Sequence, residues 1–334
     1  MKVEKLEAEV LGGYPRSERV RKMLRRVEEK AEASSIDALR STREETLFLL
    51  GVQAGAGLTA IVDPMLDWHD PLRPFVEAWR NTAVDGLIRW FDNNFFYRVP
   101  VFIDEPDAKR FVLAPRVREY RHIVPNNLRL KVVVPGPVTF AKLSRNLTGK
   151  SVEELAADIA SILEREVALA VEAGASVIQV DEPYMADVEA SKDDAVLAAE
   201  LVSRVLSPAR GKSATRLAIE YNVPSGEVYE RLLDTRVDYI VLDVVDSPGR
   251  AMELLKSRGV GGHGLGLGVI QARNIYPDKH SVVVKLVEEA VNVSEAKSVL
   301  LTTSAWLDLI PLPHAISKTN ILGYIFSRIA NAEG

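Results

Sequence analysis

The sequence of 334 residues contains no cysteine. The chain therefore has no disulfide, no thiol nucleophile and no thiolate ligand for a metal. Its formal net charge of −5 argues against a nucleic-acid partner, because nucleic-acid-binding proteins are usually basic. No stretch approaches eighteen unbroken apolar residues, and the opening MKVEKLEAEV lacks the apolar run of a signal peptide. We therefore expect a cytoplasmic protein that neither spans a membrane nor binds nucleic acid.

Histidine is also scarce, and its distribution gives no secure metal site. The five histidines are scattered, and no two of them are four residues apart. Zinc sites without cysteine usually show clearer histidine clustering. The weak candidates for metal ligands are Glu220, Asp243 and His69, which would have to converge from distant parts of the chain. A histidine such as His69, in DWHDP, is more often a hydrogen-bonded loop residue.

The chain does contain a regular alternation of short apolar runs and longer helical patterns. Eight runs are predicted strands, nearly all followed by a helix: EAEVLG (7–12), LTAIVD (58–63), LRLKVVVPG (128–136), ASVIQVDE (175–182), TRLAIEY (215–221), DYIVLDVV (238–245), GLGLGVI (264–270) and KSVLLTT (297–303). Apolar strands with helical crossovers indicate an α/β fold with a parallel sheet covered on both faces. Eight such units predict a (β/α)8 TIM barrel, and an open doubly wound sheet is the alternative.

We expect one domain over residues 1–334, because no low-complexity segment or linker marks a second. A helix is predicted around 75–91, and an insertion of irregular strands and turns near 92–127. The helix predicted at 16–31 is more charged than a barrel helix needs, and we expect it to project from the barrel. We interpret the cations of this helix as a solvated face or, alternatively, as a cluster that attracts a polyanion. These cations are Arg16, Arg19, Arg21, Lys22, Arg25 and Arg26.

Four of the predicted strands end in acidic residues: Asp63, Asp181 with Glu182, Glu220, and Asp243. Active sites of TIM barrels lie at the C-terminal ends of the strands, so these carboxylates should meet at one mouth. Carboxylates gathered there favour a substrate ammonium or a metal. For VIQVDEPY (177–184), an equally good interpretation is that Asp181 caps the following helix.

The stretch RWFDNNFFYRVP (89–100) combines five aromatic side chains with Asp92, two asparagines and Arg98. Aromatic residues at this density most often pack in a core. Here the consecutive amides and the flanking cations make a binding loop a second interpretation.

Five stretches, in the same order, resemble motifs of the cobalamin-independent methionine synthase family: LGGYPRSERVR, RWFDNNFFYRVP, PGPVTF, VIQVDEP and LGLGVIQARNIY. Enzymes of this family resemble two fused (β/α)8 barrels. The C-terminal barrel carries zinc and transfers a methyl group from a methyltetrahydrofolate to homocysteine. The resemblance spans nearly the whole chain and favours the N-terminal barrel.

The resemblance implies functions for particular residues. Asp181 corresponds to the aspartate that helps to hold the amino group of homocysteine in the catalytic barrel. Arg16, Arg21 and the 89–98 loop correspond to the half that helps to bind the glutamate tail of the folate. The substrate-binding residues that we predict are Tyr14, Arg16, Arg21, Asp63, Asn94, Asp181, Glu182, Arg273 and Asn274.

The chain departs from the zinc-bearing barrel of the family at each ligand position. Where that barrel has a His-x-Cys pair, LAIEYN has Ala218 and Glu220, and Asp243 stands at the position of the glutamate. Ser304 or Ala305 stands at the final cysteine. Zinc holds homocysteine as a thiolate, and two carboxylates without a soft ligand would not reproduce that site. We expect zinc only in a partner barrel or at a site without cysteine.

Three functions are consistent with these observations. In the first, the chain is an N-terminal-type subunit that is inactive alone. It works with a separate zinc-bearing methionine synthase barrel on homocysteine or methionine and a methylated pterin. Alternatively, it is an independent methyltransferase that uses another donor, such as a methylcorrinoid protein. The third possibility is a non-enzymatic protein that binds an amino acid or a pterin.

Overall fold

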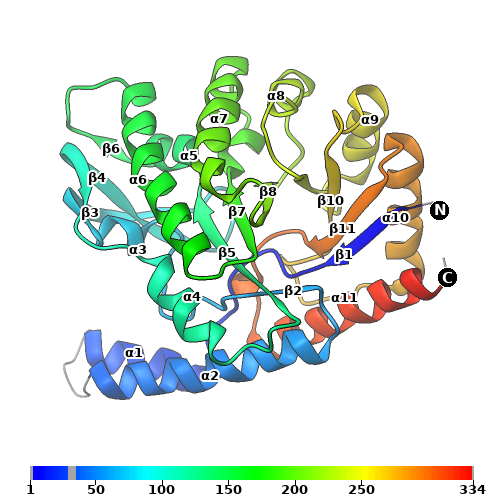
Figure 1. Ribbon diagram of the computed structural model, residues 1–334, viewed down its shortest axis with the longest axis horizontal. Coiled ribbons are helices and arrows are strands. Elements are labelled where there is room, and N and C mark those ends of the chain that lie inside the picture. Colours follow the sequence, from blue (N-terminus) through cyan, green and yellow to red (C-terminus); the bar gives the residue numbers. More distant parts are fainter. Residues whose placement is uncertain (1–2, 29–34, 333–334) are drawn as a thin grey trace.

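The computed structural model describes residues 3–28 and 35–332, and eight parallel strands form its centre (Figure 1). Neighbours in the sheet follow the order β1-β11-β10-β9-β8-β7-β5-β2. The strands are β1 (Lys5–Ala8), β2 (Ala60–Val62), β5 (Arg129–Pro135), β7 (Val177–Asp181), β8 (Ala214–Ile219), β9 (Tyr239–Asp243), β10 (Gly264–Ile270) and β11 (Ser298–Thr303). Each of the eight predicted runs contains or overlaps one of them, which confirms the strand predictions.

The sheet closes into a barrel through contacts between β1 and the residue before β2. The backbone N–H of Thr59 donates to the carbonyl of Ala8 at 2.8 Å. The N–H of Ala8 in turn donates to the Thr59 hydroxyl at 3.0 Å. The nearly closed barrel confirms the predicted TIM barrel and excludes the open doubly wound sheet. The single-domain assignment of residues 1–334 stays a prediction.

Helices surround the barrel, and most of them connect one strand to the next (Figure 1). The helices are α1 (Glu18–Glu28), α2 (Ser35–Gly55), α3 (Arg73–Val76), α4 (Leu113–Arg121), α5 (Pro137–Lys142), α6 (Val152–Glu172), α7 (Lys192–Val205), α8 (Gly226–Leu232), α9 (Pro248–Arg258), α10 (His280–Ser294) and α11 (Leu312–Ala332). No helix among the described residues is long and apolar enough to cross a membrane.

The segment between β2 and β5 differs from the prediction. The helix expected around 75–91 is wrong, because only α3 is helical there and β3 (Trp79–Arg89) follows it. β3 pairs antiparallel with β4 (Phe96–Ala108), and β4 pairs with the short β6 (Arg145–Asn146). The insertion predicted at 92–127 therefore contains the strand β4 and, after it, α4, while β6 joins the small sheet from beyond β5. Pairing with the aromatic- and valine-rich β4 outweighs the weak helical pattern of β3.

α1 lies alongside α2 at the outer edge of the molecule (Figure 1). Val20 and Leu24 of α1 pack with Ala38 of α2 in a small cluster separate from the main core. This arrangement agrees with the expectation that the charged helix predicted at 16–31 projects from the barrel. Residues 29–31 of that prediction lie outside the described residues.

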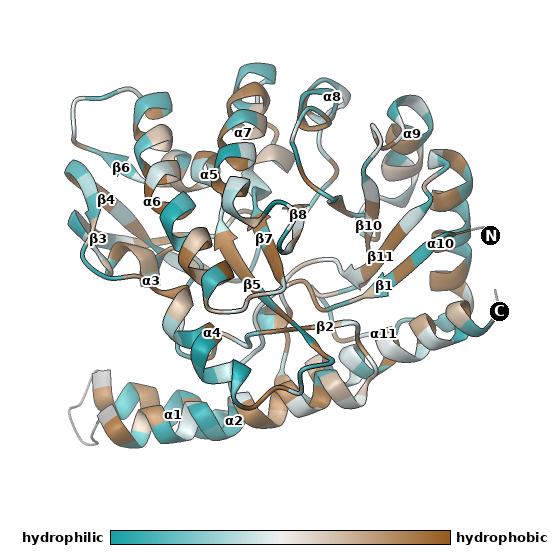
Figure 2. Ribbon diagram, in the orientation of Figure 1, coloured by the Kyte–Doolittle hydropathy of each residue, from teal (hydrophilic) through white to brown (hydrophobic). Residues whose placement is uncertain are grey.

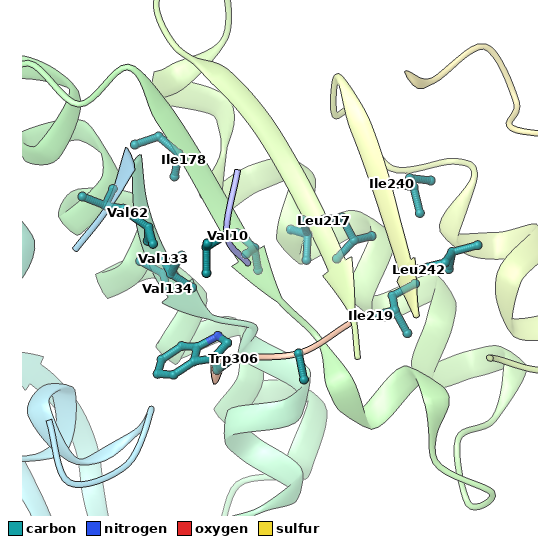
Figure 3. Packing of buried hydrophobic residues seen from close by; sticks show 14 of the residues in the cluster. Val10, Val62, Val133, Val134, Ile178, Leu217, Ile219, Ile240, Leu242 and Trp306 are labelled. Carbon is teal, nitrogen blue, oxygen red and sulfur yellow. The ribbon is translucent and has the colours of Figure 1, made fainter. Parts of the chain in front are cut away.

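Apolar side chains fill the space between the outer face of the barrel and the helices. Ile178, Leu217 and Ile240 belong to this cluster (Figure 3). Figure 2 shows the hydrophobic residues concentrated along β5, β7 and β11, which accords with strands covered on both faces.

The inside of the barrel carries buried charges, because alternate residues of a strand point to opposite faces. Lys131 of β5 donates to Glu9 at 2.9 Å and to the carbonyl of Val10 at 2.9 Å. The guanidinium of Arg216 on β8 lies 3.2 Å from Glu7 and 3.6 Å from Glu9. Burial alone would raise the pKa of Glu9, but Lys131 and Arg216 hold that pKa below its usual value.

Candidate functional site

An open cleft of about 660 Å³ lies beside the barrel mouth. Its walls come from three segments that follow β1, β2 and β11, together with Phe95 from the β3–β4 hairpin. The cleft brings together Tyr14, Arg16 and Arg21, which were predicted as substrate-binding residues, and also His69. These four residues come from two separate segments of the sequence.

The side chains of Tyr14 and Arg16 are both held by the protein. The Tyr14 hydroxyl is hydrogen-bonded to the Thr319 hydroxyl at 2.8 Å, and Tyr14 is almost fully buried. Arg16 donates from Nε to the carbonyl of Leu66 at 2.6 Å and from Nη2 to the carbonyl of Trp68. Arg21 is exposed at the rim of the cleft and is therefore accessible to a ligand.

Asp308 is a cleft residue that the sequence analysis missed. Burial raises the pKa of Asp308 to about 7, although the guanidinium of Arg16 opposes the shift. Asp308 lies in the loop after β11, which ends at Thr303, so a search of that whole loop and not of the strand end alone would have found it.

Asp181, at the end of β7, lies at the bottom of the barrel mouth. Its Oδ1 accepts a hydrogen bond from Gln179 Nε2 at 2.6 Å, and its Oδ2 accepts one from Trp306 Nε1 at 2.9 Å. Burial raises the pKa of Asp181 to about 6, against the effect of these two donors. Asp181 does not cap the next helix, a short 3-10 helix over Pro183–Ala186, because its N-cap residue is Glu182 and makes no side-chain cap hydrogen bond. The helix α7 begins later, after Ser191.

Glu220, which follows β8, lines the same small cavity as Asp181. Glu220 is almost fully buried, and its Oε2 has no hydrogen-bond partner among the described residues. Burial and the charges of Asp181 and Asp308 raise the pKa of Glu220 well above its usual range. Two carboxyl groups in one apolar cavity cannot both be ionised at low cost, so we expect them to hold at least one proton at neutral pH.

Glu182 points away from the cavity and braces the start of α5. Its Oε1 accepts from the N–H of Val138 at 3.0 Å. Its Oε2 accepts from the N–H and the hydroxyl of Thr139 at 2.8 and 2.6 Å. Burial raises the pKa of Glu182 to about 7. These contacts favour a structural function for Glu182, which has no accessible surface to offer a substrate.

Asp63 is also engaged within the protein. Arg116 of α4 forms an ion pair with it, and the Tyr120 hydroxyl donates to its Oδ1 at 3.2 Å. Asp63 does not line the open cleft or the small cavity. Its charge is therefore neutralised by Arg116, and its contacts favour a function in holding α4 against the loop after β2.

Arg273 connects the loop after β10 to the tip of the β3–β4 hairpin. It forms an ion pair with Asp246 at 2.6 Å and donates to the carbonyl of Asp92 at 2.9 Å. Trp90 in the same hairpin donates to the Tyr221 hydroxyl at 3.1 Å. The stretch 89–100 thus lies over the barrel mouth. It packs in the core through Trp90 and Tyr97 and covers the site at the same time.

The two predicted asparagines lie apart from the cavity. Asn94 is exposed at the hairpin tip. Asn274 is half-buried and accepts a hydrogen bond from the N–H of Tyr276 at 3.0 Å within its own loop. Neither lines the cleft or the small cavity, so their substrate-binding function stays a prediction.

The three weak metal candidates do not converge. Oδ1 of Asp243 accepts from the N–H groups of Val245 and Asp246, and burial raises the pKa of Asp243 to about 8. His69 lies in the cleft, and Glu220 in the separate cavity. Within residues 3–28 and 35–332, no three histidine or acidic side chains are placed to hold one metal ion.

The comparisons with known proteins agree with this fold. Residues 80–295 match the family model described as the N-terminal domain of cobalamin-independent synthase. The chain is 25% identical over 320 residues to a 5-methyltetrahydropteroyltriglutamate–homocysteine methyltransferase of Bifidobacterium animalis subsp. lactis. This alignment covers 85% of the chain and 41% of the relative, so the chain spans less than half of that protein.

A methionine synthase of Thermococcus kodakarensis is 23% identical over 330 residues, which is 95% of this chain and 91% of the relative. Among solved structures, a B12-independent methionine synthase from Shewanella sp. W3-18-1 in complex with selenomethionine has a TM-score of 0.82. That structure is 18% identical, with 99% of each chain covered, and so it supports the fold. The match to the N-terminal domain covers well over half of the sequence, and this chain therefore belongs to the cobalamin-independent methionine synthase family.

Proposed function

We propose that this chain is the N-terminal-type barrel of a two-chain methionine synthase. In this proposal it assists methyl transfer from methyltetrahydrofolate, or a related pterin, to homocysteine on a separate zinc-bearing barrel. The observation that carries the proposal is the match to the N-terminal domain of the family. The lack of a three-ligand cluster among the described residues supports it.

The open cleft supports a function in binding the anionic end of the folate. Arg21 is exposed at its rim, and the backbone carbonyls of two cleft loops hold the Arg16 guanidinium in place. On either side of Arg21 in α1, Arg19 and Lys22 are paired with Glu44 and Glu18, each at 2.7 Å. Their pairing favours a solvated helix face for that part of the cluster, whereas Arg21 is exposed and lines the cleft.

Reconstitution with the zinc-bearing barrel of the same organism tests this function. The chain alone should transfer no methyl group from methyltetrahydrofolate triglutamate to homocysteine. Adding it to the partner should lower the KM for the triglutamate substrate, and the two chains should co-purify. A partner that reaches its full rate and full folate affinity alone would contradict the proposal.

Arg21→Ala should raise the KM for the triglutamate substrate by up to about fivefold, because an exposed ion pair contributes at most about 1 kcal/mol. The KM for the monoglutamate substrate should change much less. Arg80→Ala is the matched control, since Arg80 is an exposed arginine of β3 that does not line the cleft. Equal changes in the KM for the triglutamate substrate in the two variants would show that Arg21 has no specific function in folate binding.

One observation favours an enzyme that acts alone: the Thermococcus kodakarensis relative named methionine synthase has nearly the length of this chain. An independent methyltransferase would use another methyl donor, with an oxygen-liganded metal or a cationic substrate at the acidic strand ends. Metal analysis of the purified chain distinguishes the two functions. The independent enzyme would be favoured if the purified chain contained about one equivalent of metal and if both Glu220→Gln and Asp243→Asn removed that metal.

A further inference from the structure

The tip of the β3–β4 hairpin, residues 90–95, covers the barrel mouth. The indole N–H of Trp90 donates to the Tyr221 hydroxyl at 3.1 Å, and the rings of Phe91 and Tyr221 lie 5.7 Å apart. Trp90 and Tyr221 line the small cavity in the mouth together with Trp306. This cavity of about 10 Å³ has room for about one water molecule, so anything larger can enter only if one of its walls moves.

Arg273, in the loop after β10, holds the hairpin tip in place. Its Nη1 contacts Oδ2 of Asp246 at 2.6 Å and the carbonyl of Tyr221 at 3.3 Å. Its Nη2 donates to the carbonyl of Asp92, in the tip, at 2.9 Å. One guanidinium group therefore connects the loops after β8, β9 and β10 to the hairpin.

The base of the hairpin is held differently, by buried groups. The N–H of Arg98 donates to Oδ2 of Asp70 at 3.2 Å, and Asp70 is almost fully buried. The Tyr97 hydroxyl donates to the carbonyl of Leu143 at 3.0 Å. At the tip, in contrast, the Asp92 side chain is 98% exposed. Segments whose hydrogen bonds lie next to solvent open at a lower free-energy cost than buried ones, so the tip can open while the base stays in place.

Two residues that meet under the tip have a backbone conformation that bulky side chains rarely adopt. Phe91 has φ 48° and Tyr221 has φ 74°, in the left-handed region that favours glycine. Such conformations persist only where the surrounding contacts hold them, and they gather at segments that switch between two states. Lifting the tip would separate the two rings and allow the backbone of Phe91 to relax.

We propose that the hairpin tip is a lid over the barrel mouth and that Arg273 is its latch. In the closed state seen here, Trp90 forms a wall of the cavity and Arg273 holds the Asp92 carbonyl. In the open state the guanidinium keeps Asp246, water takes its place at the carbonyl, and the cavity joins the solvent. The lid thus controls when a small molecule can enter the mouth. It depends on contacts within this chain, so it can hold or fail independently of the two-chain function.

Distances between two spin labels on the full chain test the lid. Because the chain has no cysteine, Asn94→Cys at the tip and Glu288→Cys on α10 can be labelled at these two positions alone. Arg273→Ala should raise the ratio of open to closed molecules at least about tenfold, because only the closed state loses a hydrogen bond from a charged group. Trp90→Phe keeps an aromatic ring but removes the indole N–H, and should raise the ratio about two- to tenfold.

Two controls distinguish the lid from a general loosening of the mouth. Arg250→Ala removes an arginine that donates to Oδ1 of Asn222 at 3.3 Å and to the carbonyl of Val223 at 3.2 Å, in the loop after β8. It should leave the ratio of open to closed molecules unchanged. Labels at Asp104→Cys, further along β4, and at Glu288→Cys should give one distance that no variant shifts.

Acrylamide quenching of tryptophan fluorescence reports on the cavity itself. The four tryptophans of the chain are all buried, and Trp68, Trp90 and Trp306 line the cavity. Quenching should be weak in the unaltered chain. It should increase with the open fraction in Arg273→Ala, and it should stay weak in Arg250→Ala.

The proposal is overturned if Arg273→Ala shows the same label distances and the same quenching as Arg250→Ala. It is also overturned if the label pair at 104 and 288 shifts as far as the pair at the tip, because the whole hairpin would then be loose. If Arg273→Ala folds poorly, the label distances in Trp90→Phe decide, and an unchanged ratio of open to closed molecules there refutes the lid.

Discussion

Replacing Lys131 with methionine should lower the free energy of unfolding by about 3–5 kcal/mol, because a buried carboxylate loses its hydrogen-bonded cationic partner. Lys131 and Glu9 are fully buried inside the barrel, with Nζ and Oε1 2.9 Å apart. Without the lysine, the nearest cationic atom to Glu9 is Arg216 Nε at 3.6 Å. Chemical denaturation of the two proteins at pH 7 measures the difference.

The double variant Lys131→Met, Glu9→Gln should recover much of the loss, because no unpaired charge then remains in the barrel. Lys22→Met is the control on the surface. Lys22 forms an ion pair of nearly the same length, 2.7 Å to Glu18, but both side chains are exposed, and its loss should have little effect on stability. If Lys131→Met and Lys22→Met had the same free energy of unfolding, the interior ion pair would contribute no more to stability than the exposed one.

Gly136→Ala should destabilise the protein by at least about 3 kcal/mol, although the backbone at this position suits alanine. Gly136 has φ −69° and ψ 140°, so the effect would be steric. A Cβ atom there would lie 2.0 Å from Cδ of Glu182, whose carboxylate accepts three hydrogen bonds from Val138 and Thr139. The carboxylate would have to leave donors that are buried with it.

A double-mutant cycle with Glu182→Ala isolates this cause. Glu182→Ala alone should also cost at least about 3 kcal/mol, because the N–H groups of Val138 and Thr139 lose their acceptor. Adding Gly136→Ala to it should then cost almost nothing, since the new methyl group occupies the vacated space. As a control, Gly249→Ala in α9 meets no atom within 4 Å and should be neutral or stabilising by up to about 1 kcal/mol. Additive losses at 136 and 182 would disprove the steric explanation.

The barrel was predictable because its signal is repeated along the chain. Each apolar run such as DYIVLDVV is followed by a helical pattern, and eight such units have few ways to bury their strands. The helix predicted around 75–91 was wrong because β3 is a mostly exposed strand. An exposed strand has no apolar alternation, and only its partner β4, further along the sequence, identifies it.

The acidic strand ends were also predictable, but their separate functions were not. All four carboxylates follow apolar runs, but their contacts in the folded chain differ. Asp63 forms an ion pair with Arg116, and Asp181 accepts a hydrogen bond from Trp306. Glu182 braces α5, and Asp243 accepts a backbone hydrogen bond in the loop after β9. The partners of three of them lie more than 40 residues away in the sequence. The hydrophobic periodicity and the composition of a sequence do not indicate which distant residues form such pairs.

The sequence by itself determined the eight-unit barrel, the acidic ends of its strands and the lack of any thiolate ligand. These are properties of residue type and spacing, which remain the same in any conformation. Only the tertiary structure decided which carboxylate is neutralised, which is buried without a partner and which is covered by Trp306. The electrostatic state of a side chain depends on the atoms packed around it, and closing the barrel brings those atoms together from both ends of the chain.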